Sequence, residues 1–224
     1  MPNKYERFVV AYLRLNGYFQ VPNFIVHAGD DASRISSGQI GNYTECDTLG
    51  IRLPHSAEIV GPKHVQNHTM LTGGGENRID VVIAEAKSGK ENRPNKVWAS
   101  GAVDPIGYIV RFIGAHPEGA VKPIAEGVAS KFRFEDPQAR YRYIVFSNEP
   151  NEHYGKKGVT YIPYRAAIEF IVTIRGQSWI DSGLGVSSIH QQWDEMLIDM
   201  FKIANNQDRS VEQRIADVEE FLAA

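Results

Sequence analysis

The sequence contains a single cysteine, Cys46, and this scarcity excludes an internal disulfide. Charged residues or glycine interrupt its longest apolar stretches well before the roughly 18 residues that a membrane span requires. The N-terminal residues MPNKYERF also lack a signal-peptide pattern. We therefore expect a protein that has no membrane partner and resides in the cytoplasm.

Positive charge is not in excess either, because the formal net charge of the 224 residues is -3. Without a global basic field, a polyanionic partner would have to be met by a local basic patch or through bound cations. Internal repeats, heptad arrays and low-complexity tracts are also lacking. With 42% hydrophobic residues, the chain is long enough for one well-packed domain.

What the sequence does contain is an alternation of helical and strand patterns. Apolar spacing predicts a first helix between Asn3 and Gly17, and a second helix with Asp104 as its cap and Pro105 at its first position. Segments with β patterns or continuous apolar runs predict strands at 18–29, 42–53, 78–88, 140–148 and 158–164. A further helix is expected at 164–175, and the segment 54–77 is expected to be irregular. The predicted fold class is α/β.

Two apolar stripes predict helices in the C-terminal tail. One stripe follows Ser188 and Gln191, and the other follows Ser210 and Gln213, which are capping-box pairs. We interpret both stripes as packing faces rather than as cofactor sites.

The strand predicted at 78–88 is apolar on both faces, which is typical of a central strand. Because side chains alternate along a strand, Glu85 and Lys87 share one face and Asp80 points to the other. Burying either ion alone would cost several kcal/mol, so the pair must be neutralised by each other, by a metal or by water. An ordinary salt bridge at a strand end is the structural alternative.

A second pair of acids precedes the apolar half of the strand predicted at 42–53. If this strand is the neighbour of 78–88, Asp47 stands near Glu85 and Lys87. Two carboxylates on neighbouring strands repel each other unless a positive charge lies between them. Hard oxygen ligands suit Mg²⁺ or Mn²⁺ better than zinc. Glu45 could replace Asp47 as a ligand or could simply face solvent.

This order of elements resembles the PD-(D/E)XK, or restriction endonuclease-like, nuclease superfamily. The resemblance rests on a leading helix with Glu6, a second strand with Asp47, and a third strand reading IAEAKSG, followed by helix, strand and helix. It implies a restriction endonuclease-like mixed central sheet flanked by helices, with a C-terminal helical extension. Residues 1–180 would form the core, and residues 181–224 would form the extension packed on the same domain.

The resemblance also implies the chemistry of the site. In this family, the residues matching Asp47, Glu85 and the backbone carbonyl of Ala86 hold a divalent ion, here Mg²⁺ or Mn²⁺. Lys87 would orient or deprotonate the attacking water, and Glu6 would be an auxiliary acid. The implied function is hydrolysis of DNA phosphodiester bonds by a restriction- or repair-type endonuclease. The alternative is a non-catalytic nucleic-acid-binding or interaction protein on the same fold.

Glu6 also has a structural interpretation. With Asn3 before it, Glu6 completes an N-terminal capping box, an arrangement worth about 0.5 to 2 kcal/mol of stability. We favour capping slightly over catalysis for this residue.

Basic residues directly after the Glu85 strand are the candidates for nucleic-acid binding. These are Lys90, Arg93 and Lys96. A second set with interleaved aromatic residues consists of Lys131, Arg133, Arg140 and Arg142. A solvated face is the structural alternative for both sets. The expected partner is DNA, and a homodimer formed through the tail helices is possible.

Three histidines suggest a different hypothesis, a zinc hydrolase. His64 and His68 have the i, i+4 spacing of helical zinc ligands, and His55 lies nearby. No HExxH pattern occurs, and Gly61 and Pro62 disfavour the helix that such a site needs. We therefore favour loop histidines without a metal.

Overall fold

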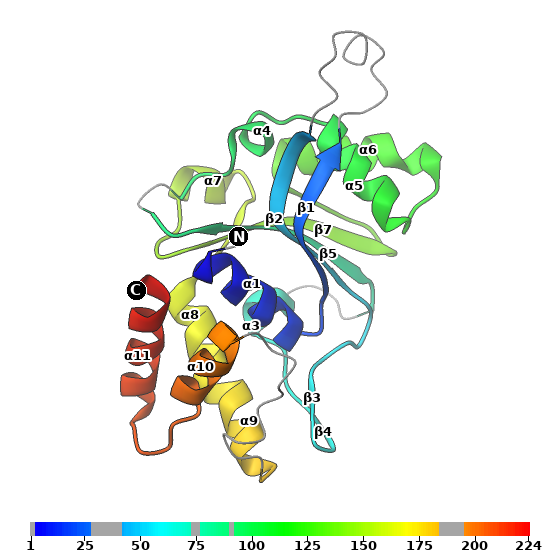
Figure 1. Ribbon diagram of the computed structural model, residues 1–224. Coiled ribbons are helices and arrows are strands. Elements are labelled where there is room, and N and C mark those ends of the chain that lie inside the picture. Colours follow the sequence, from blue (N-terminus) through cyan, green and yellow to red (C-terminus); the bar gives the residue numbers. More distant parts are fainter. Residues whose placement is uncertain (1–2, 28–41, 73–76, 90–91, 184–194) are drawn as a thin grey trace.

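The computed structural model describes residues 3–27, 42–72, 77–89, 92–183 and 195–224. A mixed central sheet lies between two groups of helices (Figure 1). The strand order is β1-β2-β5-β7-β6, and β8 also pairs with β7. The strands of this sheet are β1 (Phe19–His27), β2 (Asn42–Arg52), β5 (Ile79–Lys87), β6 (Arg133–Glu135), β7 (Ala139–Ser147) and β8 (Thr160–Pro163).

The direction of pairing changes at the centre of the sheet. Strand β2 is antiparallel to both of its neighbours, β1 and β5, whereas β5, β7 and β8 are parallel. The strands of Asp47 and Glu85 are neighbours, which is the condition on which the predicted site depends. The predicted mixed sheet with flanking helices is confirmed. The predicted central place of β5 is also confirmed, and its residues from Asp80 to Glu85 are all buried.

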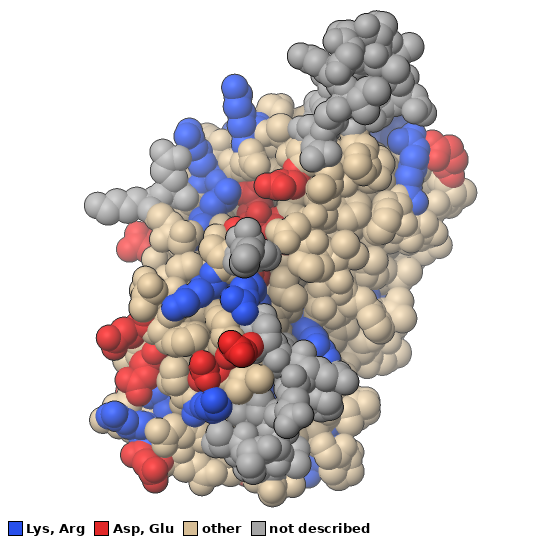
Figure 2. All heavy atoms as spheres, viewed as in Figure 1, with Lys and Arg blue, Asp and Glu red and all other residues tan. Residues whose placement is uncertain are grey.

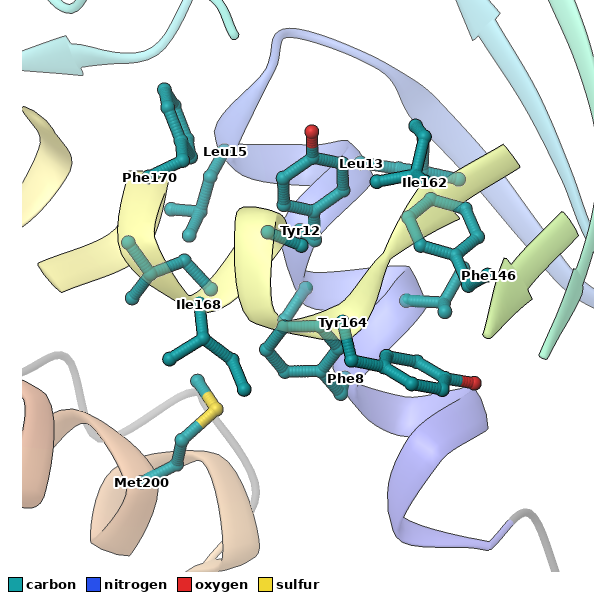
Figure 3. Close-up of a cluster of buried hydrophobic side chains, with 14 of the residues drawn as sticks. Phe8, Tyr12, Leu13, Leu15, Phe146, Ile162, Tyr164, Ile168, Phe170 and Met200 are labelled. Carbon is teal, nitrogen blue, oxygen red and sulfur yellow. The ribbon is translucent and has the colours of Figure 1, made fainter. Parts of the chain in front are cut away.

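One face of the sheet is covered by α1 (Lys4–Leu15) and by the helices that follow β8. Their buried side chains form one hydrophobic cluster with Val82 and Ala84 of β5. Figure 3 shows part of this cluster, in which Phe8 and Tyr12 of α1 meet Phe146 and Tyr164. The helices after β8 are α8 (Tyr164–Glu169), a π-helical segment (Phe170–Arg175), α9 (Gly176–Asp181), α10 (Glu195–Ala204) and α11 (Val211–Ala223).

The tail helices α10 and α11 use their apolar stripes within this chain. Met200 of α10 reaches the same cluster as α1 and α8 (Figure 3), and Val218 of α11 is also fully buried there. The predicted capping box of Ser210 and Gln213 is confirmed. Ser188 and Gln191, the cap predicted for the other tail helix, lie outside the described residues. Among the described residues, the buried side chains of both stripes pack within the chain's own core.

The opposite face of the sheet is covered by α5 (Asp104–Ile113) and α6 (Glu118–Lys131), which pack on Val81 and Ile83. The prediction that Asp104 caps α5 is wrong by one residue, because Val103 is the N-cap and Pro105 lies in the first turn. Two short helices complete the described structure around this layer, α4 (Lys96–Ala99) and α7 (Glu152–Lys156).

The segment predicted to be irregular, 54–77, contains a small amount of regular structure. A separate two-stranded hairpin projects from the molecule (Figure 1), and a single helical turn follows it. These elements are β3 (Ile59–Val60), β4 (Lys63–His64) and α3 (Thr69–Thr72). No helix in the described part of the chain is long and apolar enough to cross a membrane.

Candidate functional site

The site is built where strands β2 and β5 separate. Their backbone pairing runs from Arg52 and Asp80 up to Thr48 and Ala84 and ends there. At the next position, the Asp47 side chain replaces the backbone: its Oδ2 accepts a hydrogen bond of 2.7 Å from the amide of Ala86. Asp47 therefore reaches the segment between Glu85 and Lys87.

The other neighbour of β2 is also irregular at this position. The ladder between β1 and β2 pairs Pro22 with Thr48 and skips Asn23, whose φ is +49°. Cys46 and Leu49 lie in the same hydrophobic cluster although they are three residues apart, so the alternation of β2 is interrupted between them. Asp47 lies at this irregularity, opposite Asn23 and between Cys46 and Leu49.

Glu85 and Lys87 share one face of β5, as predicted. Lys87 Nζ lies 3.0 Å from Glu85 Oε2, and the side chains are 27% and 2% exposed, respectively. The amide of Asn95 donates to both carboxylate oxygens of Glu85, at 3.3 and 3.0 Å. The salt bridge that was the structural alternative is therefore present, and it leaves the ammonium group partly accessible to solvent.

Three carboxyl groups near this point hold their protons more tightly than usual. Burial raises the pKa of Asp47, against the lowering effects of the Ala86 amide and of Lys87. Burial likewise raises the pKa of Glu85, although Lys87 opposes it. For Glu6, burial raises the pKa and Asp47 and Glu45 add to the increase, against the Asn3 amide. Negative charge is costly here, as it is in sites that bind cations.

Glu6 lies both in the capping box of α1 and beside Asp47. Its carboxylate accepts from the Asn3 amide at 3.0 Å, which confirms the capping box. It also lines a cavity of about 190 Å³ together with Asp47 and Leu197. Glu45 is exposed, and its backbone carbonyl accepts a hydrogen bond from the Trp98 indole.

A larger hollow with basic walls adjoins Lys87. It has a volume of about 740 Å³, and Arg93, Lys96 and Tyr154 contribute to its lining. Arg93 and Lys96 are exposed. Figure 2 shows acidic and basic side chains close together on one face of the molecule. Lys90, the third predicted basic residue, lies outside the described residues.

The three histidines of the zinc hypothesis have different surroundings. Nδ1 of His68 is hydrogen-bonded to the Tyr12 hydroxyl, and the ring stacks on Phe170. His64 is exposed on the projecting hairpin, and His55 has a φ of +63° in a turn. Within the described ranges, no group of three or more His, Cys, Asp or Glu side chains is arranged to hold a metal ion.

Two residues near Glu85 were missed in the sequence. Asn95 acts through its backbone amide, which any residue other than proline could supply, so the sequence contains no indication of it. Tyr143 lies on β7 in the cluster beneath the site, and its pKa is raised by burial and by the adjacent Glu85. In the sequence, Tyr143 was one of the aromatic residues interleaved with the second basic set, and its place next to Glu85 was not predicted.

The fold and site define a mixed α/β protein with carboxylates and a lysine at the point where two central strands separate. Comparison with protein-family models, with curated proteins and with solved structures finds no match for this chain.

Proposed function

We propose that this protein is a metal-dependent endonuclease of the PD-(D/E)XK type that hydrolyses DNA phosphodiester bonds. The observation that carries the proposal is the contact of Asp47 with the Ala86 amide, directly between Glu85 and Lys87. The order of elements supports it: a helix, three antiparallel strands, helices, a parallel strand and a further helix. Asp47 of β2 thus contacts β5 at the residue between Glu85 and Lys87.

The donor set fits a hard divalent cation. Asp47, Glu85 and the backbone carbonyl of Ala86 would hold Mg²⁺ or Mn²⁺, because these ions prefer oxygen ligands and keep several waters. The raised pKa values of both carboxyl groups support this assignment, since a cation would relieve the cost of their charges. When bound, such an ion lowers the pKa of water and neutralises charge on a phosphate.

Side chains of the protein would orient the water and bind the DNA. Lys87 is anchored by Glu85, so its ammonium group can orient the attacking water and stabilise negative charge in the transition state. Glu6 would assist from the cavity that it shares with Asp47. Arg93 and Lys96 would hold the DNA backbone along the basic hollow, with Lys90 as a third contact.

A second function is favoured by the same contacts. Lys87 already neutralises Glu85, and the Ala86 amide already occupies one oxygen of Asp47. A non-catalytic nucleic-acid-binding or interaction protein would keep these contacts without turnover. Binding of DNA without cleavage in the presence of Mg²⁺ or Mn²⁺ would favour this alternative.

A cleavage assay distinguishes the two functions. Wild-type protein is incubated with supercoiled plasmid, linear duplex, single-stranded DNA and RNA, with Mg²⁺, with Mn²⁺ or with EDTA. We expect metal-dependent cleavage of DNA, and we expect Lys87→Ala to lower its rate at least about 100-fold, in the range typical of proton-transfer groups. The matched control is Lys156→Ala, an 81% exposed lysine on α7, which should cleave like the wild type. Full activity of Lys87→Ala would contradict the proposed role.

A further inference from the structure

A second polar cluster lies at the other end of β5. Three guanidinium groups surround Asp80: the Nη2 atoms of Arg52, Arg140 and Arg142 lie 3.1, 2.8 and 2.6 Å from its Oδ2. All four side chains are at most 10% exposed. The Tyr18 hydroxyl also donates to Asp80, at 2.5 Å. Among the described residues, one buried carboxylate thus forms ion pairs with three buried guanidinium groups.

The rest of the cluster supplies carbonyl groups instead of negative charges. The Leu71 carbonyl accepts a hydrogen bond from each of the three arginines. Buried charge that is not matched by opposite charge is costly, and an anion bound beside the cluster would lower that cost.

A cavity of about 610 Å³ opens onto this cluster. Arg140 and Arg142 form part of its wall, and the exposed residues Lys131 and Arg133 bring further positive charge to it. The sheet register explains the gathering, because Arg133 of β6 pairs with Arg142 of β7 and both therefore share one face. Glu135 is the acidic residue of the lining, and Arg78 lies 3.7 Å from it.

We propose that this cavity binds a phosphate group. The guanidinium groups that Asp80 fixes in place supply positive charge at the wall of the cavity, and the exposed side chains of Lys131 and Arg133 supply donors for phosphate oxygens. The volume suits a ligand of nucleotide size. Phosphate monoesters of free nucleotides and phosphates of a nucleic-acid chain share this chemistry.

The cavity is separate from the proposed cleavage site. Asp80 precedes Glu85 by five residues on β5, which is about 16 Å along a strand, and the two side chains point to opposite faces. A phosphate held by Arg140 and Arg142 is therefore not the one that would be cleaved beside Glu85. The inference does not depend on the proposed nuclease activity.

Calorimetric titration tests the inference with three probes: pyrophosphate, ATP and a 12-base-pair duplex, each at matched ionic strength in KCl. The test variant is Lys131→Gln with Arg133→Gln, because both side chains are exposed and the fold does not depend on them. The matched control is Lys122→Gln with Lys156→Gln, which removes two exposed lysines outside the cavity lining. Both double variants change the net charge equally.

We expect at least one probe to bind the wild type and the control equally, and to bind the test variant at least about 10-fold more weakly. Pyrophosphate or ATP binding would identify a free phosphorylated molecule as the ligand, and binding of the duplex alone would identify the nucleic-acid backbone. The inference is overturned if no probe binds the wild type. It is equally overturned if the test variant binds like the control.

Discussion

Each end of strand β5 carries a buried acid, and the pKa values of the two acids are shifted in opposite directions. At one end, burial opposes the charge of Asp80, but Arg142 and Arg140 outweigh it and lower the pKa. At the other end, burial of Glu85 outweighs the effect of Lys87 and raises the pKa. The number of cations decides the sign, since three arginines contact Asp80 and one lysine contacts Glu85. This difference motivates our two proposals, a cation at the Glu85 end and an anion at the Asp80 end.

The largest effect is expected from removing the charge of Asp80. Asp80→Asn leaves three buried guanidinium groups without their carboxylate, so the free energy of unfolding should fall by about 3–5 kcal/mol. Urea denaturation at neutral pH measures it. The control is Asp199→Asn, which removes an exposed acid paired with Lys202 on α10 and should change stability by less than about 1 kcal/mol. Equal effects of the two substitutions would remove the distinction between the ends of β5.

A smaller effect of opposite sign is expected from Glu85→Gln. The folded-state pKa of Glu85 is raised above 4.5, so its contribution to stability is present below pH 4.5 and is lost as the pH rises through the raised pKa. Asp80 behaves in the reverse manner: its pKa is below 3.8, and its contribution is lost as the pH falls through that lowered value. Glu85→Gln should therefore gain stability over the wild type between pH 4 and pH 8 in urea titrations. A loss that grows with pH would show that Lys87 determines the balance.

The smallest changes in stability are expected from two substitutions that distinguish capping by Glu6 from assistance in cleavage. Asn3→Ala removes the capping box of α1 and should cost about 1 kcal/mol. Glu6→Gln keeps a capping side chain but removes the charge beside Asp47, so stability should stay within about 0.5 kcal/mol of the wild type. If Glu6 assists the cleavage site, Glu6→Gln lowers metal-dependent cleavage while Asn3→Ala does not. Equal cleavage by both variants would assign Glu6 to capping alone.

Much of the fold could be predicted from local patterns. The first helix could be predicted because Asn3 and Glu6 supply its cap. Strand β5 could be predicted because it is apolar on both faces. Helix α6 was missed, since Pro123 and two glycines weaken its pattern. A Cβ atom at Gly127 would lie 2.9 Å from Phe134 Cδ2, so the Phe134 ring would have to shift. Such a requirement arises from tertiary packing, which a single sequence does not display.

The candidate site could be predicted only in part. The spacing of Glu85 and Lys87 on a buried strand is visible in the sequence, and Asp47 follows once its strand is placed next to theirs. The irregular pairing opposite Asn23 and the Asn95 amide on Glu85 depend on backbone geometry. The role of Arg140 and Arg142 was also hidden, because the sequence does not show that Asp80 gathers both of them below the surface.

The central claim is that Asp47 and Glu85 share a divalent cation. Titration of metal-free protein with Mn²⁺, followed by electron paramagnetic resonance at neutral pH, tests it most directly. We predict stoichiometric binding by the wild type, and a loss of at least about 10-fold in affinity in Asp47→Asn and in Glu85→Gln, with Asp199→Asn unchanged. Absence of Mn²⁺ binding by the wild type, or equal binding by all four proteins, would contradict the account.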